Sequence, residues 1–145
     1  MTLIDRFEAF ASDFEACAVD GKWERLRKHF VEDATYWNVG GPDPRVEGRS
    51  AIVDFLKNDF ENNDRRFDSR KLQAVAEPTV SGNQLFRQWH CTYTLAGAPD
   101  LVVEGEARYR FEEGLIASLE EEITAESMER YTAWMREFGA RLLGS

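Results

Sequence analysis

The chain has 145 residues, a length typical of one domain, and 43% of them are hydrophobic, which predicts a globular fold with a core of its own. Asp and Glu outnumber Lys and Arg by 27 to 18, giving a net charge of −9 at pH 7. An acidic surface of this kind repels nucleic-acid phosphates and anionic lipid headgroups. We therefore expect neither nucleic acid nor a membrane as a partner.

The sequence pattern favours a cytoplasmic protein. No apolar stretch approaches the length of about 20 residues that a membrane-spanning helix needs. Acidic residues such as Asp5 and Glu8 interrupt the first 20 positions, unlike the apolar segment of a secretory signal. Cys17 and Cys91 match no metal-binding or redox spacing, so we expect two buried thiols in a reducing compartment.

In chain order, the first part of the sequence predicts three helices and one strand. Apolar residues recur every three or four positions over 3–17, and a second short helix is expected over 23–30. Residues 35–39 are aromatic or β-branched and predict a short strand, which ends in a turn of Gly and Pro at 40–44. Helical spacing returns over 50–60.

The second part of the sequence predicts four strands and a last helix. Polar and apolar residues alternate in four stretches, at about 68–80, 84–95, 101–112 and 115–124. The turns between them are short, so neighbouring strands should pair antiparallel. Helical spacing over 125–143 predicts the last helix, outside a core of about 5–124. This order of elements predicts one α+β domain over 1–145, with helices on one face of an antiparallel sheet.

Alternation along the strands assigns two charged residues to the inner face of the sheet. The third of these strands has a clear apolar face ending in Tyr109 and Phe111. The same reasoning, applied to the neighbouring strands over 84–95 and 115–124, assigns Arg87 and Glu121 to the inner face. A buried charge is costly unless it is paired or faces a hydrated cavity. Two interpretations remain open: a structural ion pair, or the polar floor of a ligand pocket.

Three strings of residues resemble the nuclear-transport-factor-2-like superfamily. They are the helix-to-strand segment over 21–35, the turn into the next helix over 46–52, and the hairpin over 110–116. The resemblance implies a cone-shaped α+β fold, in which three N-terminal helices pack on the concave face of a curved antiparallel sheet around a pocket. Its members include SnoaL-like polyketide cyclases, ketosteroid isomerases, scytalone dehydratases, limonene epoxide hydrolases and non-catalytic binding modules. The fold therefore leaves the function open.

The resemblance argues against ketosteroid isomerase activity. That reaction needs an Asp base and an oxyanion hole made by a Tyr and a protonated Asp. The corresponding positions here are Asn38, Phe14 and Ala107. None of these side chains can abstract or donate the required proton.

The epoxide hydrolases are matched in part. There a Tyr-x-Asn on the first strand and a carboxylate on the last strand hold the attacking water, and Tyr36, Asn38 and Glu121 fall at those positions. The Arg-x-Asp that protonates the epoxide is replaced by Trp89 and Cys91. The resemblance therefore implies a site able to position water or take a proton, without the acid of that family.

We predict a pocket for a small, mostly apolar molecule, with acid–base catalysis of the isomerase, lyase or hydrolase type and no metal or cofactor. Its catalytic residues would be Glu121, Tyr36 and Asn38. Its ligand-binding residues would be Phe14, Trp37, Arg87, Trp89, Ala107 and Tyr109. The alternative is a non-catalytic module for small-molecule binding or dimerisation. In a pure dimerisation module the aromatic residues would fill a core, which aromatic stripes do more often than bind a ligand.

The two histidines are expected to lie outside the pocket. His29 falls in a basic stretch and is predicted to be a surface residue, whereas alternation assigns His90 to the outer face of the sheet. That face also carries Phe86, Thr92 and Thr94, and is poor in charge for a solvated surface. We therefore expect a homodimer that buries it.

Overall fold

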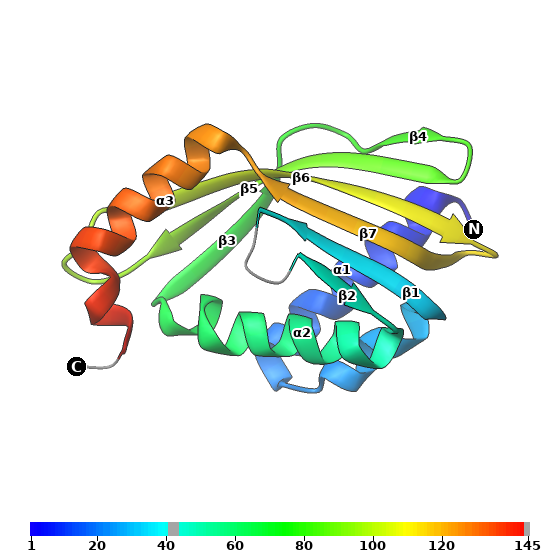
Figure 1. The fold of residues 1–145 in the computed structure, drawn as a ribbon, viewed down its shortest axis with the longest axis horizontal. Helices are drawn as coiled ribbons and strands as arrows, with labels where there is room; N and C mark the ends of the chain where they lie inside the picture. The colour runs from blue at the N-terminus through cyan, green and yellow to red at the C-terminus, as the bar shows by residue number, and fades with distance from the viewer. Residues whose placement is uncertain (41–43, 144–145) are drawn as a thin grey trace.

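A computed structural model describes residues 1–40 and 44–143, and most of the turn expected at 40–44 lies outside the described residues. Its helical segments follow the predicted order (Figure 1). They are α1 (Leu3–Asp20), η1 (Trp23–His29), α2 (Arg49–Asn62), η2 (Asp64–Arg66), α3 (Ala125–Phe138) and η3 (Gly139–Leu143), the η segments being 3-10 helices.

Local sequence fixes both ends of α1. The Thr2 side chain accepts a hydrogen bond from the backbone of Asp5, and the Asp5 carboxylate accepts one from the backbone of Thr2, which forms a capping box. Gly21 ends the helix at φ 73°, a left-handed conformation that glycine adopts without steric cost. The apolar stripe between these caps buries Phe7 and Phe10.

Seven strands form one curved, open sheet in the order β2-β1-β7-β6-β5-β3, with β4 also paired to β5. The strands are β1 (Phe30–Val39), β2 (Arg45–Glu47), β3 (Ser69–Ala74), β4 (Thr79–Ser81), β5 (Gln84–Thr94), β6 (Leu101–Glu112) and β7 (Leu115–Ile123). The sequence predicted neither the short β2 nor the full length of β1.

The sheet is mixed, which corrects the prediction of an antiparallel one. The pairs β3–β5, β5–β6 and β6–β7 are antiparallel, as their short turns require. By contrast, β1 pairs with β7 in parallel, with Tyr36 opposite Leu119 and Asn38 opposite Glu121. Most of the chain separates these two strands, so no turn length predicts their direction.

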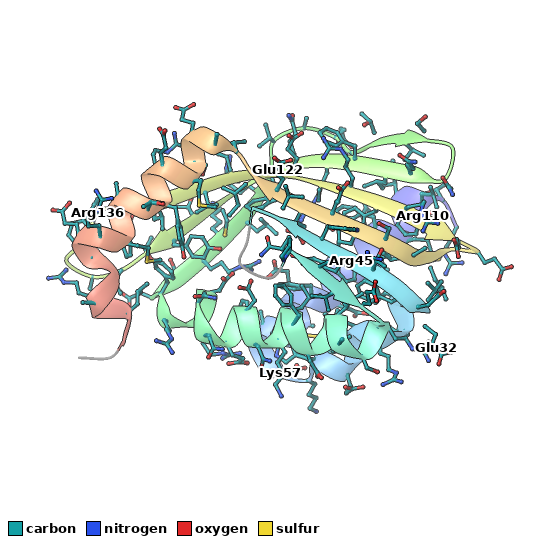
Figure 2. All side chains as sticks on the ribbon, in the orientation of Figure 1. Glu32, Arg45, Lys57, Arg110, Glu122 and Arg136 are labelled. Atoms are coloured by element: carbon teal, nitrogen blue, oxygen red, sulfur yellow. The ribbon has the colours of Figure 1, made fainter. Side chains whose placement is uncertain are left out.

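The helices α1, η1 and α2 cover the concave face of the sheet (Figure 1). Phe7 and Phe10 of α1 pack edge-on against Tyr109 of β6, with ring centroids 5.2 and 6.1 Å apart. Every second residue of β6 from Leu101 to Phe111 is buried, as alternation predicted. Charged side chains such as Lys57 and Arg110 lie on the outside of the molecule (Figure 2).

The C-terminal helix expected over 125–143 is α3 followed by η3, and it packs on its own domain at one end of the sheet (Figure 1). Trp134 is 6% exposed, its ring lies 5.4 Å from that of Phe67, and its indole N–H donates to the Pro99 carbonyl at 2.8 Å. The Ser127 hydroxyl accepts a hydrogen bond from the Glu104 backbone. None of the described helices is long and apolar enough to cross a membrane.

Candidate functional site

A cavity of about 240 Å³ lies between the helices and the concave face of the sheet. This volume is slightly below the range of roughly 300–1,000 Å³ typical of pockets for drug-sized ligands, so it suits a small molecule. Most of its lining is aromatic or aliphatic. The aromatic residues are Phe10, Phe14, Tyr36, Phe60, Phe67, Trp89, Tyr93, Tyr109 and Tyr131.

The strand register aligns four residues across the floor of this cavity. Asn38 of β1 is opposite Glu121 of β7, Glu121 is opposite Ala107 of β6, and Ala107 is opposite Arg87 of β5. Neighbouring strands lie about 4.8 Å apart, so the backbones at Glu121 and Arg87 are separated by roughly 10 Å. The β6 strand at Ala107 therefore lies between the two charged residues.

Glu121 is the carboxylate of this row and lies between Asn38 and Ala107. Protein surrounds its side chain, and solvent reaches it only in part. This burial raises the pKa of the carboxyl group, and the positive charge of Arg87 opposes the rise. Within the described part of the chain, Glu121 has no ion pair or side-chain hydrogen bond. No guanidinium nitrogen of Arg87 lies within 4.0 Å of a Glu121 carboxylate oxygen. Of the two interpretations of the inward charges, the structure therefore favours a polar floor over an ion pair.

Tyr36 and Asn38 both lie on the face of β1 that lines the cavity, next to Glu121 of the neighbouring strand β7. Tyr36 is 5% exposed, and its ring packs against Phe55 at 5.1 Å between centroids. Burial, followed by the charge of Glu121, raises its pKa well above the usual value, so the hydroxyl stays protonated. Among the residues described here, neither the Tyr36 hydroxyl nor the Asn38 amide group has a side-chain hydrogen bond, which leaves both free to bind a ligand.

The part of the cavity formed by β5 and β6 is lined by Arg87, Trp89 and Tyr109. The Arg87 guanidinium lies 5.0 Å from the centre of the Phe7 ring, in a cation–π contact. Burial raises the pKa of Tyr109, and Arg87 opposes that rise. Trp89 is 9% exposed and packs directly over Gly105, where a Cβ atom would lie 2.5 Å from its ring. Its indole N–H has no hydrogen-bond partner in the described structure.

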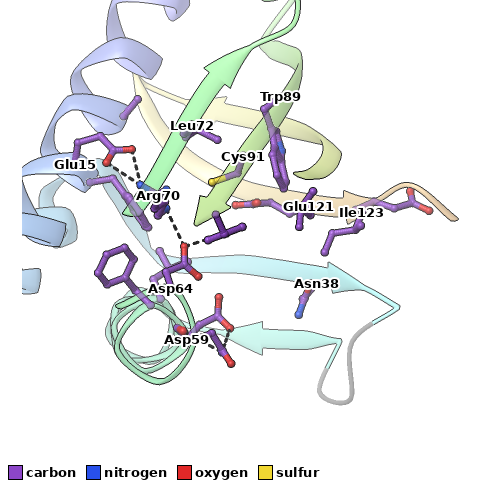
Figure 3. Close-up of a pocket in the computed structure, with 18 of the residues that line it drawn as sticks. Glu15, Asn38, Asp59, Asp64, Arg70, Leu72, Trp89, Cys91, Glu121 and Ile123 are labelled. Carbon is purple, nitrogen blue, oxygen red and sulfur yellow. Dashed lines mark hydrogen bonds and ion pairs between the residues drawn. The ribbon is translucent and has the colours of Figure 1, made fainter. Parts of the chain in front are cut away.

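A second polar cluster lies on the opposite side of the cavity (Figure 3). Arg70 of β3 binds Glu15 of α1 at 2.9 Å and Asp64 of η2 at 2.8 Å, and the Tyr93 hydroxyl donates to Asp64 at 3.2 Å. Burial raises the pKa of Asp64 to about 6, although Arg70 opposes the shift. Asp59 of α2 lies at the solvent-exposed mouth of the cavity and accepts a hydrogen bond from the side chain of Asn63.

The cavity contains seven of the nine residues predicted for the site. They are Phe14, Tyr36, Asn38, Arg87, Trp89, Tyr109 and Glu121. Trp37 does not line it, because its neighbours Tyr36 and Asn38 face inward and the strand turns Trp37 to the other side, under the Arg45 guanidinium at 5.0 Å. Ala107 is fully buried in the floor and also does not line the cavity.

The histidines lie outside the cavity, but not in the same way. His90 is on the outer face of the sheet, as predicted, and hydrogen-bonds to Gln73 at 2.8 Å. His29 is not a free surface residue: its side chain is 14% exposed, and its ring nitrogen lies 2.7 Å from the Asp13 carboxylate. The sequence around His29 is basic, so it gave no indication of an acidic partner such as Asp13 on α1.

Sequence reasoning missed Asp59, Asp64 and Arg70. The alternation of Arg70 and Leu72 on β3 has the same form as that of Arg87 and Trp89 on β5, so it was a usable indication of an inward Arg. Asp64 follows the end of α2, where a polar residue normally indicates only a helix stop.

The described residues contain no group of three or more His, Cys, Asp or Glu side chains arranged to hold a metal ion. Cys17 and Cys91 are both buried and unpaired, as predicted. Burial raises the pKa of each thiol, which disfavours the reactive thiolate.

An open mixed sheet that curves around a cavity and is covered by helices on one face is the fold of solved proteins described as nuclear-transport-factor-2-like. The SnoaL-like domain family matches residues 7–119, and the chain belongs to this family. A search of curated protein sequences finds no significant match.

Solved structures with the same fold share little sequence with this chain. An LEH-like epoxide hydrolase from M. tuberculosis is 15% identical with a TM-score of 0.66, over 99% of this chain and 96% of that one. Bal32a, from a soil-derived mobile gene cassette, is 15% identical with a TM-score of 0.66, over 92% and 98%. A Catenulispora acidiphila protein with a ketosteroid isomerase-like fold, solved with trimethylamine, is 16% identical with a TM-score of 0.59, over 81% and 87%.

Proposed function

We propose that the protein binds a small, mostly apolar molecule in this cavity and that Glu121 acts on it as a general base. The observation that carries the proposal is an enclosed carboxyl group that has no ion pair among the described residues. It lies next to two polar groups, those of Tyr36 and Asn38, that no described side chain binds. A base in an apolar cavity is poorly solvated and has a raised pKa, and both properties strengthen its attraction for a proton.

Tyr36 and Asn38 would assist Glu121 in two ways. The protonated Tyr36 hydroxyl can donate a hydrogen bond to a substrate oxygen or to a water molecule. The Asn38 amide can both donate and accept, so with Glu121 it can orient a water for attack. The site thus suits reactions that begin with proton transfer to a carboxylate: isomerisation, elimination or hydrolysis.

The same cavity supports a second candidate, a module that binds a small molecule without transforming it. No histidine lines the cavity among the described residues, so the general acid most common in enzymes is missing there. A protein of the same fold was solved with trimethylamine, a small organic molecule, which is compatible with either function.

A base-promoted ring opening tests the proposal without knowledge of the natural substrate. In 5-nitrobenzisoxazole, removal of the ring C–H proton by a base breaks the N–O bond and releases a coloured cyanophenolate. We expect binding in the cavity and turnover that Glu121→Gln lowers by roughly 10²–10⁴-fold. Glu120→Gln is the matched control, because Glu120 is the adjacent carboxylate on β7 with its side chain on the opposite face.

The outcomes separate the two candidates. Turnover that depends on Glu121 but not on Glu120 supports the base. Binding of the probe without turnover supports the binding module. Turnover that is equal in wild type and Glu121→Gln would contradict the role proposed for Glu121.

A further inference from the structure

The charges that line the cavity do not balance. Glu122 lines the cavity next to Glu121, but alternation turns its side chain to the outer face of β7. Without it, four carboxylate side chains face two guanidinium groups among the described lining residues. Arg70 is fully engaged by Glu15 and Asp64, at 2.9 and 2.8 Å. The remaining inward carboxylates are Asp59 and Glu121, and within the described structure neither has an ion pair.

Arg87 acts on Glu121 only from a distance and does not form an ion pair with it in the described structure. The strand of Ala107 separates the two residues, and no ion pair joins them in the described structure. The guanidinium instead stacks on the Phe7 ring at 5.0 Å, on the side of the cavity where α1 packs. The two ends of the floor therefore differ in charge: Glu121 marks an acidic end and Arg87 a basic one.

Independent features of the acidic end suit a cation. The Tyr36 hydroxyl, on a side chain that is 95% buried, lines the cavity without a partner among the described residues, and its oxygen can accept a hydrogen bond from an N–H group. The faces of aromatic rings attract cations, and Tyr36 and Tyr131 contribute rings to the lining. Figure 3 shows Glu121 and Asn38 facing Asp59 and Asp64 across the cavity.

We propose that the ligand of this cavity is a small organic ammonium ion. Its positive charge lies against Glu121 and Tyr36, with Asp59 at the mouth attracting it from solvent, and its apolar part lies among the aromatic rings. This inference rests on the proposed small-molecule binding at the same site and adds the charge of the ligand. It does not require that Glu121 also act as a base.

Three probes of similar size and different charge test the inference: benzylammonium, benzyl alcohol and benzoate, titrated by calorimetry near neutral pH. We expect benzylammonium to bind about tenfold or more tightly than benzyl alcohol, which corresponds to ~1.4 kcal/mol, and benzoate to bind most weakly. The preference for the cation should fall at higher salt, because the mouth is open to solvent and its charge is screened.

Variants locate the preference. Glu121→Gln should reduce the preference for benzylammonium over benzyl alcohol to near unity, and Asp59→Asn should reduce it several-fold. Asp54→Asn is the control, because Asp54 is, like Asp59, an exposed carboxylate of α2, but it does not line the cavity. Circular dichroism of each variant verifies that the fold is retained.

Each result decides the matter. If benzyl alcohol binds as tightly as benzylammonium, the cationic ligand is refuted while small-molecule binding stands. If benzoate binds most tightly, Arg87 determines the ligand and the inference fails. If none of the three binds, the inference fails, and the proposed function then depends on its own assay with the nitrobenzisoxazole.

Discussion

Replacing Glu121 with Gln should leave the protein as stable as the wild type near pH 4, below the unfolded pKa of a Glu side chain, and make it more stable at pH 8. The reason is that Glu121 bears a desolvation cost in its charged form, and in the described part of the chain no ion pair offsets that cost. Its folded-state pKa is raised, so the folded state binds the proton more tightly than the unfolded state does. Stability is therefore fully present below the unfolded pKa and is lost as the pH rises through the folded pKa.

The magnitude distinguishes an unpaired Glu121 from a structural ion pair. Each unit by which the folded pKa exceeds the unfolded one equals about 1.4 kcal/mol of stability, or a Tm change of roughly 3–6 °C for a domain of this size. If Glu121 were instead the partner of Arg87, its loss would leave a buried unpaired charge. That would cost roughly 3–5 kcal/mol, a Tm decrease of about 6–20 °C.

Thermal unfolding followed by circular dichroism between pH 4 and pH 8 measures the difference. We expect curves that coincide at low pH and diverge in favour of Glu121→Gln at high pH. Glu120→Gln, on the outer face of the same strand, should follow the wild type throughout. A decrease of several degrees for Glu121→Gln at pH 8 would refute the reasoning and identify Glu121 as a structural ion.

Three further predictions concern other parts of the molecule. Arg70→Met leaves Asp64 without its cation, so we expect a loss of about 3 kcal/mol in urea unfolding at pH 8. Because the pKa of Asp64 is about 6 and rises further without Arg70, the loss should shrink at pH 5, where the carboxyl group is neutral; an equal loss at both pH values would contradict this. Gly105→Ala places a Cβ atom 2.5 Å from the Trp89 ring and 2.8 Å from the Glu122 carbonyl oxygen, and should cost roughly 1–3 kcal/mol; an unchanged urea midpoint would show that the sheet adjusts freely. The outer face of the sheet is proposed to pair two copies, so light scattering at micromolar concentration should give a dimer, and a monomer would contradict it.

Periodicity predicted the fold well wherever a single face is buried. Strand β6 alternates without interruption between buried and more exposed residues because one side packs on helices, and β5 follows the same period less strictly. This period correctly turned Arg87, Trp89 and Tyr109 inward. The same rule, applied strictly, would have excluded Trp37, which alternates with two inward residues. Trp37 was included because it is aromatic, but the two-residue period of the strand decides which face a side chain lies on, whatever its type.

Relations between distant segments were beyond the reach of the sequence. The parallel pairing of β1 with β7 brings Asn38 opposite Glu121, yet no turn or pattern encodes which strands meet. The contact of Arg70 with Glu15 and Asp64 joins a strand, a helix and a 3-10 turn, so it is visible only in three dimensions. The resemblance to a superfamily supplied Tyr36, Asn38 and Glu121, but not the second polar cluster.

Titration of the Glu121 carboxyl group, followed by NMR of its side-chain carbon in the wild-type protein, tests whether this group is enclosed and unpaired. If it is, its pKa should lie above the ordinary value of 4.5. The pKa should rise further in Arg87→Met, because the positive charge of Arg87 lowers it. A pKa at or below 4.5 in the wild type would contradict the role proposed for Glu121, since only an ion pair or strong hydrogen bonds would hold the buried carboxylate ionised.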